Sequence, residues 1–477
     1  MPRDEQELVE AMAALLGDQR VLAGSAAKRA YDCDAYTVDR SAPGCVVLPE
    51  STEEVQAVVR WCIAHDTPYT PRGAGTGLSG GALPAMGGVL VSTKRMTRIL
   101  EIDVPNRCLR AQAGAVNLKL SKAVAQHGLH FAPDPSSQTV CTLGGNIAEN
   151  SGGPHTLKHG VTAQHVLQLT MVDTKGDVAV LGGRVAGQPG LDLLGIFVGS
   201  EGTLGIVTEA WVRLTPDPEC VETALASFPS IRSATETVTE IIASGTIPAA
   251  LEMIDENCLK AVLAAFPLGV PDGTKALLLI ECDGETGATR REIGEVVEVC
   301  ERRGAISVEV AKDEAHRKKL WTARKKGIGA MGRLAPTIVT HDGVIPRSKL
   351  PEMLDFIYRV ADEHGLGVGN MFHAGDGNLH PIFYFDDRQA GKIDAVVAAG
   401  EKVIRKCIEL GGSASGEHGI GVEKSELLKL MFDERDMRMQ KDARAVFNES
   451  PLCNPCKIIP DQKGCIEHMR RWRGAAT

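Results

Sequence analysis

The stretch TPRGAGTGLSGG, residues 70–81, places five glycines directly after a short strand-like segment. Backbone N–H groups can converge on a phosphate only where no side chain intervenes, and closely spaced glycines leave that space. The glycines do form a G-x-G-x-x-G, but the strand-like GVLVST follows them where a dinucleotide-binding Rossmann domain would have a helix. The stretch also lacks the G-x-x-x-x-G-K-[ST] pattern of an ATPase P-loop. Both common phosphate-binding folds are therefore disfavoured.

Two further glycine-rich stretches follow in the same part of the chain, CTLGGNIAENSGG (residues 141–153) and GSEGTLGIVTEA (residues 199–210). Each alone could be a set of tight turns, whereas three in one folding unit favour a dinucleotide site with three glycine-rich loops. The intervening sequence alternates strand and helix patterns. Ser51 or Thr52 is expected to cap one helix, whose single apolar face is formed by Val55, Val58, Val59 and Cys62. Residues 42–217 are thus predicted to form an α+β unit.

Composition is that of an ordinary globular protein: of 477 residues, 43% are hydrophobic and 24% are charged. The length allows two or three domains. A net charge of −9, with no long basic run, argues against a nucleic-acid partner. The N-terminus lacks the layout of a signal peptide, and no segment offers about 18 uninterrupted apolar residues. We therefore expect a cytoplasmic protein without a transmembrane segment.

Thirteen cysteines are scattered along the chain, which is typical of reduced thiols rather than of a disulfide framework. Cys453, Cys456 and Cys465 form a C-x-x-C followed by a third cysteine, a spacing that could hold a metal or an iron–sulfur cluster. A fourth ligand at a suitable spacing is missing, so structural or incidental thiols are the favoured interpretation. The sequence does not assign these three cysteines a role.

The second half of the chain alternates strand and helix patterns that predict an antiparallel sheet backed by helices. This second α+β domain is expected to span residues 222–420. A helical segment, residues 1–41, precedes the first domain, and another, residues 421–477, follows the second.

The stretch GNMFHAGDGNLHPIFYFD, residues 369–386, carries His373 and His380 on either side of a tight turn. Two short strands could point both imidazoles the same way, and neutral imidazole binds divalent metals well. Glu417, in SGEHGIG, would supply a third ligand and leave a position for substrate. From spacing alone, three ordinary polar residues at a surface turn explain the pattern equally well. Asp376 and Asn378 are read as residues that stiffen the turn, or as partners of the metal ligands.

The three glycine-rich stretches resemble the FAD loops of the vanillyl-alcohol-oxidase-type, or PCMH-type, flavoproteins. The motifs HAGDGNLHP, SGEHGIG and Asn-Pro-Cys-Lys resemble the D-2-hydroxy-acid dehydrogenase branch, which includes glycolate oxidase flavoprotein subunits and FAD-linked D-lactate and D-2-hydroxyglutarate dehydrogenases. The tail departs from this pattern, because Cys456 stands where the family usually has glycine. The resemblance implies an α+β fold: a PCMH-type FAD-binding domain, a ferredoxin-like antiparallel substrate domain and a helical C-terminal segment that returns to the FAD domain.

The resemblance also implies how FAD is held. Members with covalent flavin often carry a histidine in the first glycine loop, where this sequence has Gly-Thr-Gly-Leu, so non-covalent FAD is expected. The residues implied to bind it are Pro71, Arg72, Gly73, Ala74, Gly75, Thr76, Gly77, Ser79, Gly80, Pro133, Thr142, Gly144, Gly145, Asn146, Ala148, Glu149, Asn150, Gly152, Gly202, Gly205, Ile206, Val207 and Asn454.

For the chemistry, the resemblance favours the metal site of His373, His380 and Glu417, with zinc preferred by ligand type and manganese or cobalt also suited. It places a carboxylate-binding arginine at Arg324, whose planar guanidinium can make two parallel hydrogen bonds. The implied reaction is oxidation of a D-2-hydroxy acid to the 2-oxo acid. Metal assists loss of the hydroxyl proton to His418, and hydride passes to the flavin.

Several alternatives stay open. Arg347 is a second candidate for binding a carboxylate. Neither Thr340 nor His341 is a fixed cation, which favours glycolate or D-lactate over D-2-hydroxyglutarate. A metal-dependent hydrolase, a non-catalytic flavin subunit of an electron-transfer complex and a non-redox ether-lipid synthase are the rival classes. Without an NAD fingerprint, the expected electron acceptor is an iron–sulfur subunit, a quinone or a flavoprotein. Such a partner subunit could bring the protein to a membrane.

Overall fold

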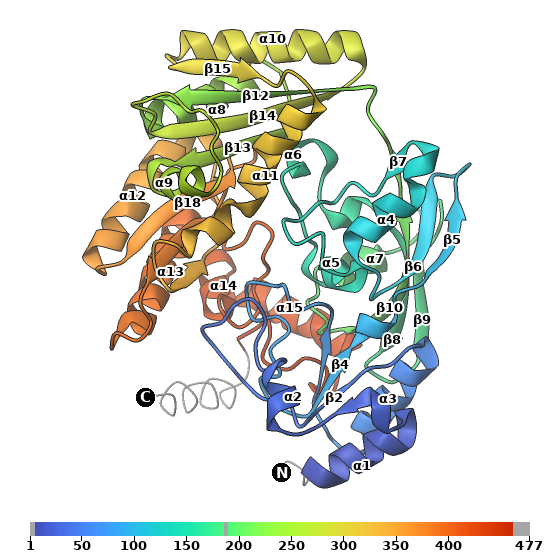
Figure 1. Cartoon of the computed structure of the whole chain (residues 1–477). Coiled ribbons are helices and arrows are strands. Elements are labelled where there is room, and N and C mark those ends of the chain that lie inside the picture. Colours follow the sequence, from blue (N-terminus) through green and yellow to red (C-terminus); the bar gives the residue numbers. More distant parts are fainter. Residues whose placement is uncertain (1–4, 186–188, 461–477) are drawn as a thin grey trace. The chain divides into compact units, whose positions relative to one another are not determined.

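A computed structural model describes residues 5–185 and 189–460, so Cys465 and the end of the predicted helical tail lie outside the described residues. The chain divides into two compact units (Figure 1). Unit 1 comprises residues 1–152, 161–216 and 418–477, and unit 2 comprises residues 153–160 and 217–417. The domain limits inferred from the sequence stay predictions.

Unit 1 begins with a small sheet whose strands β2, β4 and β3 are parallel, with β1 antiparallel at one edge. Helix α3 (Thr52–Ala64) connects β2 to β3, and the Ser51 side chain caps it by accepting a hydrogen bond from the Glu54 N–H. The predicted apolar face of this helix is confirmed, since its four members are fully buried. The strand order is β1 (Val21–Leu22), β2 (Cys45–Val47), β4 (Val89–Ser92), β3 (Tyr69–Arg72).

A second, antiparallel sheet forms the rest of the unit 1 core. Helices α4 (Asn117–Val124) and α5 (Leu143–Glu149) contribute buried apolar residues to the same core as this sheet. Helix α1 (Glu5–Leu16) packs instead on the α3 side of the small sheet. The strand order is β5 (Ile99–Asp103), β6 (Cys108–Gln112), β10 (Gly205–Arg213), β8 (Val166–Asp173), β9 (Val178–Gly182).

Residues 141–153 were expected to form only a glycine-rich loop, and this expectation is wrong, because Leu143–Glu149 form helix α5. Thr142 caps this helix, because its side chain accepts a hydrogen bond from the Gly145 N–H. Gly144 packs so closely on Ala113 that a Cβ there would stand 2.7 Å from the alanine Cβ. Capping and close packing offset the poor intrinsic helix propensity of glycine.

The remaining elements of unit 1 are short, apart from one C-terminal helix. The main chain of Tyr69 at the start of β3 forms a parallel bridge with Cys453, so the end of the described chain joins the first sheet. These elements are α2 (Ser25–Arg29), the pair β7 (Leu129–His130) and β11 (Thr215–Pro216), α7 (Leu193–Phe197), α14 (Leu428–Met431) and α15 (Glu434–Phe447).

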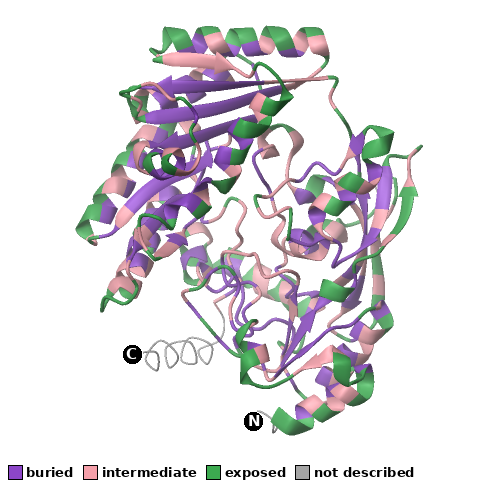
Figure 2. Cartoon of the chain, viewed as in Figure 1, coloured by how far each residue is buried: buried purple, intermediate pink, exposed green. Residues whose placement is uncertain are grey.

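Unit 2 is built on a large antiparallel sheet, which confirms the predicted architecture. Its central strands are almost wholly buried and appear purple in Figure 2. The main path is β15 (Ser307–Val310), β12 (Cys220–Phe228), β14 (Ala276–Gly284), β13 (Ala250–Asp255), β18 (Gly367–His373), β19 (Asn378–Leu379), β17 (Gly343–Val344); β20 (Pro381–Phe385) pairs with β18 and with β16 (Thr337–Thr340).

Helices cover both faces of this sheet. Helices α9 (Glu256–Ala265) and α11 (Glu314–Met331) share one apolar core with Leu277 and Leu279 of β14. Leu278 and Ile280 alternate with these residues and so point to the opposite face. The other helices that contact strands of this sheet are α8 (Ile231–Ala243), α10 (Thr286–Arg302), α12 (Leu350–Glu363), α13 (Lys392–Glu409) and the short α6 (Thr156–His159).

Eleven cysteines in the described part of the chain are free thiols, as expected from their scatter. Cys456 departs from that expectation, because it is disulfide-bonded. Within residues 5–185 and 189–460, no helix combines the length and the apolar character needed to cross a membrane.

Candidate cofactor and metal sites

The three glycine-rich stretches meet in unit 1. Main-chain hydrogen bonds join the second to the third, because the Glu201 N–H donates to the Ala148 carbonyl oxygen at 2.8 Å and the Gly199 N–H donates to that of Ile147 at 2.9 Å. The first and third are in contact where Gly202 meets the ring of Pro71. Their convergence is what a single dinucleotide site requires.

Glycine is required in this cluster because other groups occupy the space that side chains would fill. A Cβ on Gly73 would clash with the Thr142 hydroxyl. Gly75 has φ +73°, in the left-handed region, and the Arg72 guanidinium lies where its Cβ would stand. Glycine thus lets the main chain pack closely against Thr142 and Arg72, and binding of FAD by main-chain N–H groups stays a prediction.

The residues implied to bind FAD are spread over these converging segments. Pro71 and Arg72 lie at the end of β3. Thr142 caps α5, and the residues from Gly144 to Glu149 lie in that helix. Gly205, Ile206 and Val207 begin β10. Ser79 is fully buried, whereas Thr76 is half-buried. Pro133 is buried beside α4, where its carbonyl oxygen accepts a hydrogen bond from the Asn117 amide. Their individual contacts with the cofactor stay predictions.

The Asn-Pro-Cys-Lys segment binds the glycine-rich stretches to one another. The Asn454 side-chain amide donates hydrogen bonds to the carbonyl oxygens of Gly81, at 2.9 Å, and Glu201, at 2.6 Å. Lys457 is fully buried and donates to the Leu83 carbonyl oxygen at 2.7 Å. Burial lowers the pKa of the Lys457 ammonium to about 8.

Three acidic side chains are enclosed near the same stretches. Burial raises the pKa of Asp34 to about 6, although the N–H groups of Tyr36 and Ala82 donate to its carboxylate. Burial also raises the pKa of Glu149 well above its usual range, and neighbouring Glu201 adds to the effect. Glu201 is held by the N–H groups of Ile420 and Gly421, at 2.6 and 2.7 Å. Burial thus disfavours the charged form of all three carboxyl groups.

The predicted metal ligands come together in unit 2. His373 ends β18, and His380 lies between β19 and β20. The Nε2 atoms of His373 and His380 lie 3.3 and 3.1 Å from the same Glu417 oxygen, Oε1. The three residues offer ligand atoms that all lie within 4.8 Å of one another. Two imidazoles and a carboxylate are the donor set of an open zinc site, so these residues fit a divalent metal.

A buried carboxylate that the sequence analysis did not identify orients this site. Glu252, on β13, has no exposed surface, and its Oε1 lies 2.6 Å from His373 Nδ1. A carboxylate can only accept, so Nδ1 carries a proton, and Nε2 is the nitrogen left to bind a metal once it gives up its own proton. Burial would raise the pKa of Glu252, but the Arg324 guanidinium and His373 together hold that pKa below its usual value.

Burial and the carboxylates act in opposite directions on the pKa values of the ligands themselves. Burial favours neutral His373, but Glu252 and Glu417 raise the pKa of this histidine well above its usual range. Burial also favours a neutral Glu417, yet His373 and His380 hold the pKa of that carboxyl well below its usual range. The negative charges of Glu252 and Glu417 favour a positive charge at the imidazoles. A divalent metal ion supplies more positive charge than the proton that it would replace.

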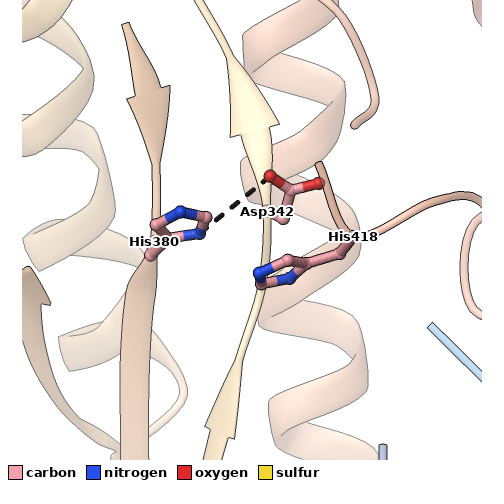
Figure 3. A group of neighbouring side chains, drawn as sticks. All are labelled: Asp342, His380 and His418. Carbon is pink, nitrogen blue, oxygen red and sulfur yellow. Dashed lines mark ion pairs between the residues drawn. The ribbon is translucent and has the colours of Figure 1, made fainter. Parts of the chain in front are cut away.

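A second buried carboxylate, Asp342, holds the segment that carries Glu417. Its Oδ2 accepts hydrogen bonds from the Ser415 hydroxyl at 2.5 Å and from the Gly416 N–H at 2.9 Å. Figure 3 shows Asp342 with His380 and His418, and its dashed line marks the ion pair between Asp342 Oδ1 and His380 Nδ1, 4.0 Å apart. His418 follows Glu417 directly, so the peptide bond keeps it near; these three residues also offer ligand atoms within 4.8 Å of one another.

The two candidate arginines lie in different surroundings. Arg324, on α11, is 3% exposed and forms an ion pair with Glu252 through Nη2. Its Nε is buried and meets no hydrogen-bond partner among the described residues. Arg347 is half-buried and donates from Nη1 to the Gly375 carbonyl oxygen at 3.0 Å, within the turn between the two histidines. Arg324 therefore has a donor without a partner among the described residues, while Arg347 supports the turn.

Other residues singled out from the sequence support the turn or the core. Asp376 accepts a hydrogen bond from the Asn378 N–H at 3.1 Å, which is the turn-stiffening role expected of it. His341 is 4% exposed and packs edge-on against Phe383, with Gly400 beneath its ring. It is therefore a core residue.

Family models match both halves of the chain. Residues 43–182 match the family described as "FAD binding domain". Residues 217–458, half of the chain, match the family described as "FAD linked oxidases, C-terminal domain". The protein belongs to this family of FAD-linked oxidases. It carries a PCMH-type FAD-binding domain, as the resemblance implied.

Relatives with similar sequences cover almost the whole chain. It is 42% identical to the glycolate oxidase subunit GlcD of Escherichia coli K12, over 92% of this chain and 88% of that protein. It is 33% identical to a D-lactate dehydrogenase of Anaerostipes hadrus, over 93% and 95%. The 4-ethylphenol oxidase of Gulosibacter chungangensis shares the fold, with a TM-score of 0.78 at 18% identity over 97% and 98% of the chains.

Glu252 and Asp342 are the functional candidates that sequence reasoning missed. Glu252 did leave a signal, since an acidic residue interrupts the apolar run ALEMI of a buried strand. Asp342 left a weaker signal in the sequence, because aspartate is common where a strand ends. Neither signal identifies a partner, which only the pairing of distant segments supplies.

Proposed function

We propose that this FAD-linked oxidoreductase oxidises a small D-2-hydroxy acid, glycolate or D-lactate, to the 2-oxo acid. The observation that carries the proposal is the convergence of His373, His380 and Glu417 next to the buried pair of Glu252 and Arg324. This arrangement combines a candidate metal site with a candidate carboxylate-binding cation, and a 2-hydroxy acid has a group for each. Relatives called glycolate oxidase subunit and D-lactate dehydrogenase support the same substrate class.

Each residue has one task in this proposal. Arg324 binds the substrate carboxylate with donors that include the Nε left without a partner among the described residues. His373, His380 and Glu417 hold a divalent metal, zinc by ligand type, and the chemistry such a cation supplies is a lower pKa of the substrate hydroxyl. His418 accepts the hydroxyl proton. FAD, bound non-covalently by the glycine-rich stretches, supplies the capacity to take up two electrons together with the α-hydrogen.

A short substrate fits the charges of unit 2. A dicarboxylate would need a second fixed cation, and the positions after α11 where one is expected carry Thr340 and His341. His341 is enclosed in the core, and Arg347 is committed to the Gly375 carbonyl oxygen. We therefore rank glycolate and D-lactate ahead of D-2-hydroxyglutarate.

The test is to add each of a panel of hydroxy acids to the protein without oxygen and to measure flavin reduction as the loss of visible flavin absorbance. We expect glycolate or D-lactate to bleach FAD- and zinc-loaded protein, and L-lactate and D-2-hydroxyglutarate to do so slowly. The matched variant is Glu417→Gln, which should keep its flavin and fail to bleach. If no hydroxy acid bleached protein that demonstrably held both FAD and metal, the proposal would be wrong.

The electron acceptor we propose is a partner iron–sulfur subunit, a flavoprotein or a quinone. The relative from E. coli is called a subunit, which supports a partner. In this proposal the protein is cytoplasmic and reaches a membrane only through that partner. Steady-state turnover should proceed with an artificial dye or a quinone and should be negligible with NAD. Rapid turnover with NAD as sole acceptor would contradict this part of the proposal.

A further inference from the structure

Glu252 is an unusual residue for the centre of a sheet. It lies on β13 between Leu251 and Met253, and no part of it is exposed. Leaving an ionised carboxylate in an apolar interior without partners is strongly unfavourable, so such a group must be paired. Its two oxygens have different partners: Oε1 meets His373 and Oε2 meets Arg324.

Strand pairing sets the first contact. β13 and β18 are antiparallel, and Glu252 stands directly opposite His373 in their register. Residues opposite each other in an antiparallel pair project to the same face with their Cβ atoms about 5 Å apart. The contact between Oε1 and Nδ1 is 2.6 Å, and it turns Nε2 of the imidazole towards Glu417, 3.3 Å away. Glu252 thus fixes both the tautomer and the direction of the ring.

The second contact comes from a helix on the same face of the sheet. Arg324 lies on α11, in the layer that shares its core with β13 through Ile254. Its Nη2 pairs with Glu252, while its Nε stays without a partner among the described residues. A guanidinium is planar, so anchoring one edge determines where the remaining donors point.

We propose that Glu252 is a positioning residue that aligns two groups at once, the metal ligand His373 and the carboxylate-binding Arg324. This inference rests on the proposed function and adds a coupling between metal and substrate binding to it. When Glu252 is neutralised, both should weaken, although Glu252 itself touches neither metal nor substrate.

The decisive variant is Glu252→Gln, which preserves side-chain size. An amide can satisfy either His373 or Arg324 but offers no second charged oxygen. We expect zinc affinity, measured by competition with a chelator, to fall about 10- to 100-fold, while flavin content stays that of wild type. The Kd for a non-reactive carboxylate, followed by perturbation of the flavin spectrum, should rise as well.

Glu281 provides a matched control in the same unit. It is also a buried strand glutamate, 4% exposed, and it also contacts one histidine and one arginine, His155 at 3.1 Å and Arg317 at 3.2 Å. Glu281→Gln therefore reproduces the loss of a buried carboxylate away from the metal ligands. We expect this variant to lose stability without a change in zinc affinity.

Two further variants keep the inference testable if Glu252→Gln folds poorly. Arg324→Gln leaves the contact between Glu252 and His373 in place, so it should bind zinc normally and the carboxylate weakly. The double variant Glu252→Gln/Arg324→Gln removes both members of a buried ion pair, which is tolerated better than removal of one. It should still lose zinc affinity, because His373 has lost its carboxylate.

The outcomes separate the inference from the proposed function. If wild type binds zinc tightly and Glu252→Gln and the double variant bind it within twofold of wild type, the role of Glu252 is wrong while the proposed function stands. If Glu281→Gln loses as much zinc affinity as Glu252→Gln, the effect is general and the inference is also wrong. If wild type holds no divalent metal, the metal-assisted part of the proposed function fails first and this inference fails with it.

Discussion

The glycine-rich stretches of unit 1 and the histidine cluster of unit 2 are built in opposite ways. In unit 1 the binding surface is main chain, and the sequence keeps side chains out: Gly73 and Gly75 have no space for a Cβ. In unit 2 the surface consists of side chains, and two carboxylates, Glu252 and Asp342, hold the ligand-bearing residues in place. The comparison teaches that the unit 1 site should be damaged by adding side-chain atoms to its glycines. The unit 2 site should be damaged by removing side-chain atoms from its ligands or from the carboxylates that hold them.

The largest effect should follow from removing a ligand in unit 2. We expect Glu417→Gln, His373→Ala or His380→Ala to lose metal and to slow substrate-dependent flavin reduction by about 10³-fold or more, since a metal contributes several kcal/mol of stabilisation. FAD content should be unchanged. Metal analysis and stopped-flow absorbance measure the two properties, and His364→Ala, on a histidine outside the cluster, is the control. Loss of FAD in the ligand variants would break the separation of the two sites.

His418 should produce the next largest effect. His418→Ala should keep both FAD and metal while flavin reduction slows by about a hundredfold, the usual contribution of a general base. His127, exposed on the surface of unit 1, supplies the control His127→Ala. If His418→Ala instead lost metal and regained activity with excess zinc, His418 would be a ligand, and the trio of Asp342, His380 and His418 would be the better description of the site.

A smaller effect is expected from adding one methyl group in unit 1. Gly75→Ala combines an unfavourable left-handed φ of +73° with a clash at the Arg72 guanidinium. FAD affinity, measured by reconstitution of deflavinated protein, should fall by about tenfold, while zinc affinity is unchanged. Gly128→Ala shares the left-handed backbone, φ +64°, but has open space, so it isolates the cost of strain. Equal FAD affinities of the two variants would show that crowding at Gly75 is unimportant.

The smallest effect concerns Asp34, which lies beside the first glycine-rich stretch. Its pKa in the folded protein is raised to about 6, so the folded state holds this proton more tightly than the unfolded state. Its contribution to stability is fully present below about pH 4 and is lost as the pH rises through about 6, at roughly 1 kcal/mol per pH unit. Asp34→Asn should flatten the stability profile between pH 4 and 6, as measured by urea unfolding at saturating FAD. An unchanged slope would contradict the raised pKa.

Within unit 1, two helices differed in how well the sequence predicted them, and the reason is physical. Local patterns sufficed for α3, because Val55, Val58, Val59 and Cys62 repeat at helical spacing, and Ser51 has the side chain that caps a helix. They failed for α5, where two glycines obscured a helix that tertiary packing on Ala113 stabilises. Propensity is a weak guide wherever packing decides.

The histidine cluster shows the same limit at longer range. His373 and His380 are seven residues apart, so a turn could be predicted to bring them together. Glu252 is separated from His373 by 121 residues, and only the register of β13 against β18 makes them neighbours. A sequence pattern can indicate that Glu252 is buried and charged, but it carries no information about that register.

The hydrogen bonds from the Asn454 side chain to the carbonyl oxygens of Gly81 and Glu201 have a consequence for the synthesis of the protein. Gly81 and Asn454, which donates to its carbonyl oxygen, are 373 positions apart in the sequence. At ribosomal speeds of about 5 to 20 residues per second, roughly 20 to 75 seconds pass between the synthesis of the first glycine-rich stretch and that of Asn454. Unit 2 emerges in full during that interval, so the nascent chain can complete its second unit before its first. We therefore expect FAD to bind only after Asn454 has been synthesised, and a stop codon just before Asn454 should yield protein without bound flavin.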